Sequence, residues 1–295
     1  MENKRWYGID VGGTSVKVGL FEGEKLVDKW SVPTDISDGG KNIIPDIVRS
    51  LPGPAAGAAL AVPGAVLPDG TVNRCVNLGW GVCRPTDEFT ALTGIPCKVL
   101  NDANAAALGE QRLGGGKGFE DVLLLTLGTG VGGGVVLGGK VRNGARGAAG
   151  EIGHLSMDPN DTAAACTCGH VGCLEQYCSA TGICRLAAQA GFPGLSCIQI
   201  VDSAAAGDEK LNAVVDNACD ILGRGIADAC AILDPEVVVL GGGVANAGEF
   251  FRLKVQNAFD RYAFHACLGT QITLATLGGD AGITGAALYA MESGA

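Results

Sequence analysis

Three cysteines and two histidines lie close together in the segment GEIGHLSMDPNDTAAACTCGHVGC, in a chain of 295 residues with only three histidines. Cys166, Cys168 and Cys173 follow the pattern C-x-C-x4-C. Three thiolates and one imidazole complete a tetrahedral zinc site, and the imidazole can come from His154 or from His170. This spacing differs from the C-x2-C that is usual for structural zinc ligands. The alternative is a group of buried, unpaired thiols, since free cysteine is among the most buried residue types. The polar, glycine-rich setting of CTCGHVGC favours zinc.

Glycine turns follow three apolar segments, at Gly12-Gly13-Thr14, Gly128-Thr129-Gly130 and Gly241-Gly242-Gly243. A phosphate group needs exposed backbone N–H groups, and glycine allows the backbone to approach it closely. A tight hairpin is the alternative for any one turn, and no turn has the G-x-x-x-x-G-K-[ST] pattern of a Walker A loop. Three such turns, two of them in similar hairpins, favour a nucleotide-binding site.

Two charged residues lie beside the first glycine turn. Asp10 precedes the turn, where it can either bond the turn's own N–H groups or hold Mg²⁺ next to phosphates. The spacing leaves both roles open. Lys17 can reach a phosphate from the next strand, although a lone lysine on a strand is usually only solvated.

The segment Asn101-Asp102-Ala103-Asn104 lies where a short apolar strand turns into a helix that ends near Gly114. Asn and Asp are preferred helix N-caps, so the residues alone favour a capping role. A carboxylate at such a corner is also well placed to take a proton from a bound hydroxyl group. A single cap needs one of these side chains, and three are present, so a catalytic role stays open.

Strands and helices must alternate to position these residues. Apolar, partly alternating segments near the glycine turns predict strands, and 3.6-residue periodicity between them predicts helices. This pattern indicates an α/β fold. The segments GIDVGGTSVKVGL and LTLGTGVGGGVVL share a strand, a Gly/Thr turn and a second strand, which suggests an internal duplication.

The overall composition narrows the classes of partner. The formal net charge is -10 and no basic stripe offsets it, so neither nucleic acid nor an anionic membrane is expected as a partner. The sequence shows no secretory leader and no apolar run long enough to span a bilayer. We therefore expect the 12 cysteines to be reduced thiols in a cytoplasmic protein.

Five segments, in order along the chain, resemble motifs of the ROK family of sugar kinases and sugar-responsive repressors. DVGGTSVKVGL and LTLGTGVGGGVV resemble its two phosphate motifs, and NDANAAALGE its catalytic corner. GEIGH with CTCGHVGCLE resembles its sugar and zinc signature, and VVVLGGGV its adenosine motif. The correspondence covers essentially the whole chain. Within the family, VNLGW is most similar to bacterial glucokinases.

The resemblance implies an actin-like ATPase fold, a duplicated ribonuclease H-like α/β architecture in which two lobes flank a cleft. It implies a small lobe of residues 1–112 plus 281–295, with the first phosphate motif and the catalytic aspartate. The large lobe, residues 113–280, would hold the second phosphate motif, the zinc site and the adenosine motif. A homodimer or homotetramer is also implied.

The implied reaction is phosphorylation of the 6-hydroxyl of glucose by ATP with Mg²⁺, and Asp102 would be the general base. The sugar would be held by Gly64, Asn77, Asn101, Asp102, Glu151, His154 and Glu175. The nucleotide would be held by Asp10, Gly12, Gly13, Thr14, Lys17, Gly128, Thr129, Gly130, Gly132, Gly241 and Gly242.

For the metal, the resemblance favours His154 over His170 as the fourth ligand, beside Cys166, Cys168 and Cys173. Four protein ligands leave no open position, so this zinc would be structural. It would order the loop that carries the sugar-binding residues Glu151, His154 and Glu175. The glycine turns that hold ATP are expected to lie apart from this loop.

The alternatives to a glucokinase are a kinase for another sugar, a repressor and an inactive scaffold. A kinase for N-acetylmannosamine, fructose or allose would share the catalytic residues. A repressor of the same family would carry a helix-turn-helix before the first phosphate motif, whereas only nine residues precede Asp10 and nothing basic and helical is present. The intact Asp10, Asp102 and glycine turns argue against an inactive scaffold. The sequence leaves open whether ATP, ADP or polyphosphate is the donor.

Overall fold

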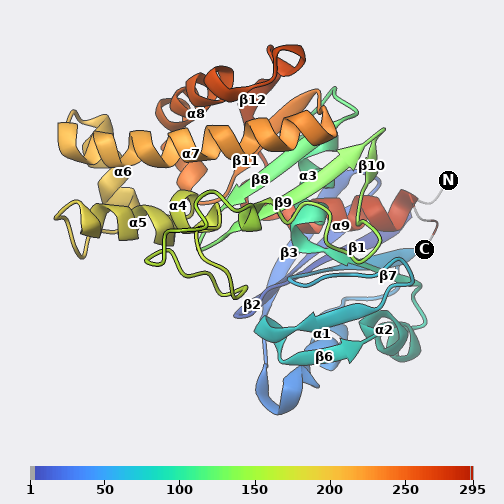
Figure 1. The fold of residues 1–295 in the computed structure, drawn as a ribbon. Coiled ribbons are helices and arrows are strands. Elements are labelled where there is room, and N and C mark those ends of the chain that lie inside the picture. Colours follow the sequence, from blue (N-terminus) through green and yellow to red (C-terminus); the bar gives the residue numbers. More distant parts are fainter. Residues whose placement is uncertain (1–3, 293, 295) are drawn as a thin grey trace. The chain divides into compact units, whose positions relative to one another are not determined.

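The structure is a computed structural model that describes residues 4–292 and 294 (Figure 1). Strands and helices alternate along the chain, as the sequence predicts. The elements are β1 (Arg5–Val11), β2 (Ser15–Glu22), β3 (Lys25–Pro33), α1 (Ile43–Ser50), β4 (Gly57–Val62), β5 (Val72–Cys75), β6 (Trp80–Cys83), α2 (Pro85–Thr93), β7 (Cys97–Asn101), α3 (Asp102–Leu113), β8 (Val122–Leu127), β9 (Val131–Leu137), β10 (Lys140–Val141), α4 (Glu175–Cys178), α5 (Ala180–Gln189), α6 (Cys197–Ala205), α7 (Glu209–Leu233), β11 (Val237–Gly241), α8 (Glu249–Tyr262), β12 (Gln271–Leu274) and α9 (Ala281–Glu292).

The chain divides into two compact units. Unit 1 consists of Met1–Lys117, Gly134–Gly150 and Gly279–Ala295, and unit 2 of Gly118–Gly133 and Glu151–Gly278. The division falls inside β9. Compared with the lobes expected from the sequence, residues 134–150 group here with the N-terminal unit.

Two five-stranded sheets have the same strand order. The first is β3-β2-β1-β4-β7 and the second is β10-β9-β8-β11-β12. In the first sheet, β1 pairs antiparallel with β2 and parallel with β4, and β4 pairs parallel with β7. In the second, β11 pairs parallel with both β8 and β12. This repetition is what an internal duplication predicts.

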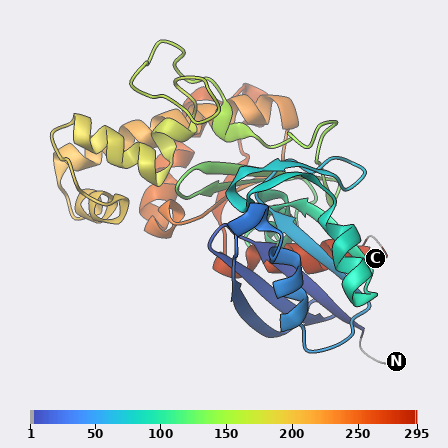
Figure 2. The ribbon, with the colours of Figure 1, turned by 90° about the horizontal axis from the view of Figure 1, so that it is seen from below.

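In unit 1, alternate residues of the central strands face opposite layers of helices, because side chains on a strand point alternately to its two sides. Tyr7 and Leu60 pack in one cluster with residues of α1 and α2. Ala59 and Ala61 pack on the other side with Ala105 of α3 and with α9. Figures 1 and 2 show α1 and α9 on opposite sides of the strands. The β7–α3 corner is therefore anchored by a layer of small residues.

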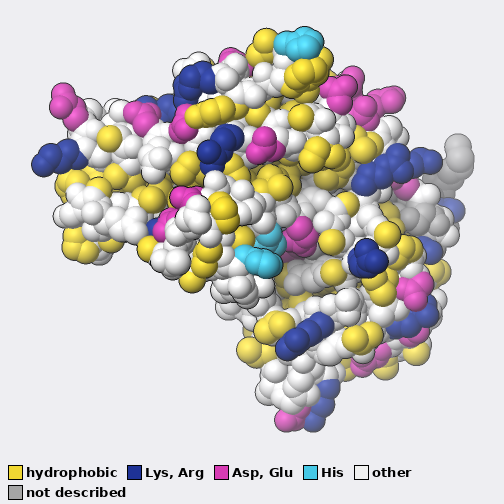
Figure 3. Space-filling model, in the orientation of Figure 1, with side chains coloured by type: hydrophobic (Ala, Val, Ile, Leu, Met, Phe, Trp, Pro, Cys, Tyr) yellow, Lys and Arg dark blue, Asp and Glu magenta, His cyan; other side chains and the backbone are white. Residues whose placement is uncertain are grey.

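In unit 2, the strand β11 is buried at every residue, which is typical of a parallel strand covered on both faces. Helix α7 packs tightly on α8, where a Cβ at Gly223 would overlap Ala258. None of the helices in the described part of the chain is long and apolar enough to cross a membrane. On the face drawn in Figure 3, Lys and Arg side chains are scattered among Asp and Glu.

Candidate active site and metal centre

At the corner between β7 and α3, the residue that caps the helix is Asn101 rather than Asp102. The side chain of Asn101 is the N-cap, since its Oδ1 accepts a hydrogen bond from the backbone N–H of Asn104 at 3.1 Å. Its Nδ2 donates to the carbonyl of Gly64 at 3.4 Å. Asp102 is the first helical residue, and its Oδ1 accepts the N–H of Ala103 at 2.8 Å. The N-cap of the helix is therefore Asn101 and not Asp102.

A buried cysteine that the sequence analysis missed lies beside this corner. The Cys75 thiol donates to the carbonyl of Pro63 at 3.2 Å. Burial, together with the charge of nearby Asp102, raises the pKa of Cys75 to about 11. A Cβ at Gly64 would lie 3.3 Å from the Cβ of Cys75, so glycine fits closely there. Nothing in the sequence around Cys75 marked it as a neighbour of the corner.

The first glycine turn touches the predicted sugar-binding segment. A Cβ at Gly13 would lie 3.2 Å from the carbonyl oxygen of Asn77, so the turn and Asn77 are neighbours within unit 1. The hydroxyl of Thr34 donates to the carbonyl of Gly12 at 2.7 Å, and its N–H donates to the carbonyl of Thr14 at 3.1 Å. Thr34, which the sequence analysis did not single out, therefore braces the turn.

Asp10 and Lys17 face each other across β1 and β2. Burial raises the pKa of Asp10, and the charge of Lys17 opposes this shift. A Cβ at Gly282 would lie 2.8 Å from Oδ2 of Asp10, so the carboxylate points at the first turn of α9. Lys17 donates to the carbonyl of Gly279 at 3.1 Å, which ties the strand to the segment before that helix.

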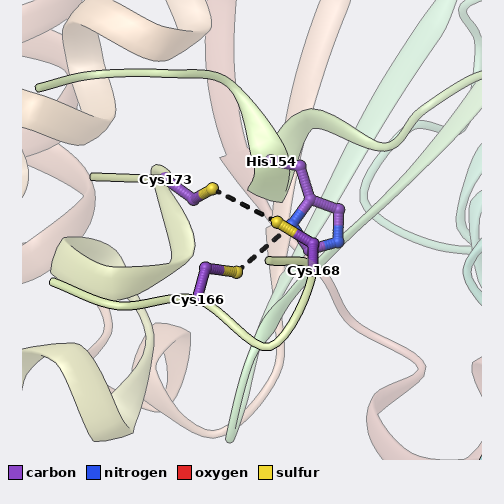
Figure 4. A group of neighbouring side chains, drawn as sticks. All are labelled: His154, Cys166, Cys168 and Cys173. Carbon is purple, nitrogen blue, oxygen red and sulfur yellow. Dashed lines mark hydrogen bonds between the residues drawn. The ribbon is translucent and has the colours of Figure 1, made fainter. Parts of the chain in front are cut away.

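In unit 2, four side chains converge as a metal site would require (Figure 4). The ligand atoms of His154, Cys166, Cys168 and Cys173 all lie within 4.8 Å of one another. The Cys168–Cys173 sulfur separation is 3.7 Å, and Nδ1 of His154 lies 3.6 Å from the sulfur of Cys166. A tetrahedral zinc ion with ordinary bond lengths sets ligand atoms about 3.8 Å (S–S) and about 3.5 Å (S–N) apart. His170 is not part of the group.

The thiols of this group differ in their proton affinity. The backbone N–H of His170 lowers the pKa of Cys168, whereas burial raises the pKa of Cys173 to about 12. Metal ligands must be deprotonated, so a metal bound here displaces protons. The remaining nitrogen of His154, Nε2, lies 3.8 Å from a carboxylate oxygen of Glu151.

Glu175 connects the cysteine loop to the second glycine turn. Its Oε2 accepts the N–H of Val131 at 3.0 Å, and its Oε1 lies 3.7 Å from the sulfur of Cys166. A Cβ at Gly130 would overlap this carboxylate, so a larger residue there would displace the side chain of Glu175. The expectation that the glycine turns lie apart from the metal loop is therefore wrong for the second turn. Glutamate is long enough to bridge the two, and no local sequence pattern reports such a contact.

The second glycine turn is held by the start of α5. The N–H of Ala180 donates to the carbonyl of Gly128 at 2.8 Å, and the hydroxyl of Thr181 donates to the carbonyl of Thr129 at 3.0 Å. Gly132 follows as the second residue of β9. At the third turn, Gly241 ends β11, and Gly242 has φ +85° against the backbone of Leu127. No other residue type fits that position without strain.

A cavity of about 450 Å³ lies between the second and third turns, within unit 2. One wall is Gly128 and Thr129, and another is Gly243 with the residues that follow it. The rest of the lining is largely apolar and includes Ile198, Val201, Asp202, Val244, Asn246 and Ala247. The α6 residues of this lining were not predicted from the sequence. An apolar cavity bordered by two glycine turns suits a nucleoside with its phosphates at the turns.

The sequence matches the ROK family over residues 6–293. It is 38% identical over 309 residues to a protein named glucokinase from Halalkalibacterium halodurans, covering 95% of this chain and 93% of the relative. The chain belongs to the ROK family.

Solved ROK structures have the same fold. A ROK hexokinase from Thermus thermophilus superimposes with a TM-score of 0.86 at 36% identity, covering 98% of this chain and 99% of the other. A ROK family glucokinase from Streptomyces griseus, in complex with glucose and AMPPNP, gives 0.80 at 30% identity over the same shares. The predicted actin-like ATPase fold is thereby confirmed. The ROK relatives also include an N-acetylmannosamine kinase from Escherichia coli O1:K1, 35% identical and covering 96% of this chain and 97% of the relative.

Proposed function

We propose that this ROK protein is a glucokinase, which transfers a phosphoryl group from ATP to the 6-hydroxyl of glucose. The observation that carries the proposal is the β7–α3 corner, where Asn101 caps the helix and Asp102 follows as the first helical residue, directly after the end of a strand. Phosphoryl transfer requires chiefly the positioning of the hydroxyl and the stabilisation of phosphate charge. A carboxylate that accepts the hydroxyl proton contributes roughly 10²–10⁴-fold to such a reaction.

Sugar hydroxyls are assigned to the polar residues that the sequence predicts. In unit 1 these are Gly64, Asn77 and Asn101, of which Asn101 precedes Asp102 and donates to the carbonyl of Gly64. In unit 2, we assign sugar hydroxyls to Glu151, His154 and Glu175. Carboxylates accept two hydrogen bonds at once, which suits the neighbouring hydroxyl groups of a hexose.

The phosphates are assigned to the glycine turns and their neighbours. We propose that Gly12, Gly13 and Thr14, and Gly128, Thr129, Gly130 and Gly132, line the phosphates, together with Gly241 and Gly242 at the adenosine motif. The N–H groups of Gly12 and Gly128 donate inside the turns, to the carbonyls of Ser15 and Gly130. Asp10, which offers a carboxylate oxygen directly before the first glycine turn, is the residue that would hold Mg²⁺. Bound Mg²⁺ supplies charge neutralisation of the phosphates. Lys17 would tie β2 to the segment before α9 through its bond to Gly279, and its positive charge would favour the ionised form of Asp10.

The cysteine site is assigned to structural Zn²⁺, held by His154, Cys166, Cys168 and Cys173. The spacing of the sulfur and nitrogen atoms fits tetrahedral coordination, and four protein ligands leave no place for a substrate. With Nδ1 of His154 turned toward the cysteines, Nε2 carries the proton and becomes a donor of fixed direction. The predicted oligomer and the cytoplasmic location stay predictions.

The sugar panel tests the substrate. With Mg·ATP and purified protein, we expect glucose to give the highest kcat/KM, with mannose or glucosamine weaker, because the chain is most similar in VNLGW to bacterial glucokinases. A coupled assay over a panel of hexoses measures this directly. If N-acetylmannosamine or fructose exceeds glucose tenfold, the protein is a ROK kinase for that sugar. A ROK repressor would give no turnover with any sugar.

The donor is tested at Asp202. Its carboxylate borders the apolar cavity and makes no side-chain hydrogen bond or ion pair within the described residues, so we assign it to the ribose hydroxyls. Replacing Asp202 with Asn should raise the KM for ATP by roughly tenfold, the cost of a lost charge-assisted hydrogen bond. The KM for glucose should stay the same. Faster turnover with polyphosphate than with ATP in the unchanged protein would overturn the assignment of a nucleotide donor.

A further inference from the structure

A second cavity, of about 550 Å³, lies in unit 1 beside the start of β7. This strand is at the edge of the first sheet, and Asn101 is its last residue. The walls come from the turn at residues 67–70, the first part of α2, the start of β7, Asn143 and Tyr289. Cavities of about 300–1,000 Å³ commonly hold small molecules. None of these lining residues has a role in the proposed reaction.

Polar groups of this cavity lack partners in the protein. Within the described residues, the side chains of Thr86, Thr90, Lys98 and Tyr289 make no hydrogen bond or ion pair, and all line the cavity. Hydroxyl and amine groups without a partner in the protein can hydrogen-bond a bound molecule. The cavity wall therefore offers several such groups to the polar atoms of a ligand.

The charges of the lining indicate a neutral ligand. Arg84 forms an ion pair with Asp87 at 3.2 Å, and Oδ1 of Asp69 accepts the N–H of Thr71 at 3.0 Å. With Lys98, the two acidic and two basic side chains cancel. The rest of the lining holds three hydroxyl groups, an amide, one aromatic ring and several apolar side chains, a mixture that suits the hydroxyl and C–H surfaces of a sugar or polyol.

Hydrogen bonds connect this cavity to the catalytic corner. Oδ1 of Asn143, in the cavity wall, accepts from Nδ2 of Asn104 at 3.1 Å. Asn104 is 1% exposed, and its Oδ1 accepts the N–H of Val135 at 3.3 Å. Its own N–H donates to the side chain of Asn101. A ligand that draws Asn143 away from Asn104 would therefore loosen the cap next to Asp102.

We propose that this cavity is a second ligand site for a neutral, hydroxyl-rich small molecule of the sugar or polyol class. Its occupancy changes turnover through Asn143 and Asn104. The site is separate from the sugar contacts assigned above, so the proposal adds a regulatory ligand to the proposed reaction.

The binding test uses trehalose and sorbitol as probes in saturation-transfer NMR, with enough glucose present to fill the reaction site. We expect transfer to both probes or to one of them in the unchanged protein. Thr90→Trp fills the cavity and should abolish the transfer, whereas Leu92→Trp, on the same helix but 53% exposed and outside the lining, should preserve it. Tyr289→Phe removes one hydroxyl and should weaken the transfer by about fivefold, the worth of one hydrogen bond.

The coupling test measures kcat with the best hexose and saturating ATP, with and without each probe. We expect the probe that binds to change kcat in the unchanged protein and in Leu92→Trp, but not in Thr90→Trp. The proposal is overturned if neither probe shows transfer, if transfer is equal in Thr90→Trp, or if binding leaves kcat unchanged. The NMR experiment needs no turnover, so a failure of the proposed kinase activity would be seen separately in the hexose panel.

Discussion

Replacing Asp102 with Asn should lower kcat by roughly 10²–10⁴-fold while glucose still binds, because the amide cannot take the proton of the sugar hydroxyl. The substitution is mild for the fold. Asn101 supplies the cap of α3, and the Oδ1 of an asparagine at position 102 can still accept the N–H of Ala103. Steady-state kinetics together with glucose binding by calorimetry would separate the loss of chemistry from a loss of affinity.

A matched control exists at the start of α7. Asp208 is the N-cap of that helix, and its side chain accepts the N–H groups of Lys210 and Leu211. Asp208→Asn is the same chemical change at a helix start without a proposed role in catalysis, so its kcat should match that of the unchanged protein. Near-normal turnover in a folded Asp102→Asn protein would leave Asp102 as a structural residue of the corner.

The corner shows how much of the site the sequence predicts. Local rules predict a strand, an Asn or Asp cap and a helix near Gly114, and the structure has β7, the Asn101 cap and α3 with Gly114 as its C-cap. The same rules could not decide between Asn101 and Asp102 as the cap. That choice depends on the direction of each side chain, and the hydrogen bond from Asn101 to Gly64 joins residues 37 apart in sequence.

Contacts between distant segments explain the rest of what the sequence missed. Thr34 braces the first glycine turn, and Glu175 reaches the N–H of Val131 across 44 residues. Cys75 lies beside Asp102 without any motif around it. A local pattern reports periodicity and turn chemistry, whereas these contacts follow from how strands are ordered in each sheet. The repeated strand order agrees with the internal duplication that the two similar Gly/Thr hairpins predict from the sequence.

Replacing Cys168 with Ser should remove the zinc and raise the KM for glucose by roughly tenfold or more. Loss of one thiolate leaves the tetrahedral site incomplete. Disturbing the contacts around a metal site typically lowers metal affinity or activity by about 10–100-fold. His154 would then lose its fixed orientation, and with it the neighbouring Glu151, whose carboxylate lies 3.8 Å from Nε2. Elemental analysis and glucose titration of both proteins measure the two effects.

Cys168→Ser should also weaken the binding of ATP, an effect that the sequence alone did not predict. Glu175 lies beside Cys166 and holds the N–H of Val131 next to the second glycine turn. Losing that one hydrogen bond is worth about 0.5–1.5 kcal/mol, so the KM for ATP should rise roughly 2–10-fold. The effect on ATP should therefore be smaller than the effect on glucose.

Cys184→Ser is the matched control, because Cys184 lies on α5 of the same unit and outside the cluster. It should keep both the zinc and the kinetics. Structural zinc also contributes to folding, so circular dichroism must first establish that Cys168→Ser is folded. Two results would contradict the assignment: unchanged protein that carries no zinc as purified, or a folded, zinc-free Cys168→Ser protein that binds glucose as tightly as before. The first result would mean that the three thiols and the imidazole hold no metal. The second would mean that the zinc does not order the sugar-binding loop.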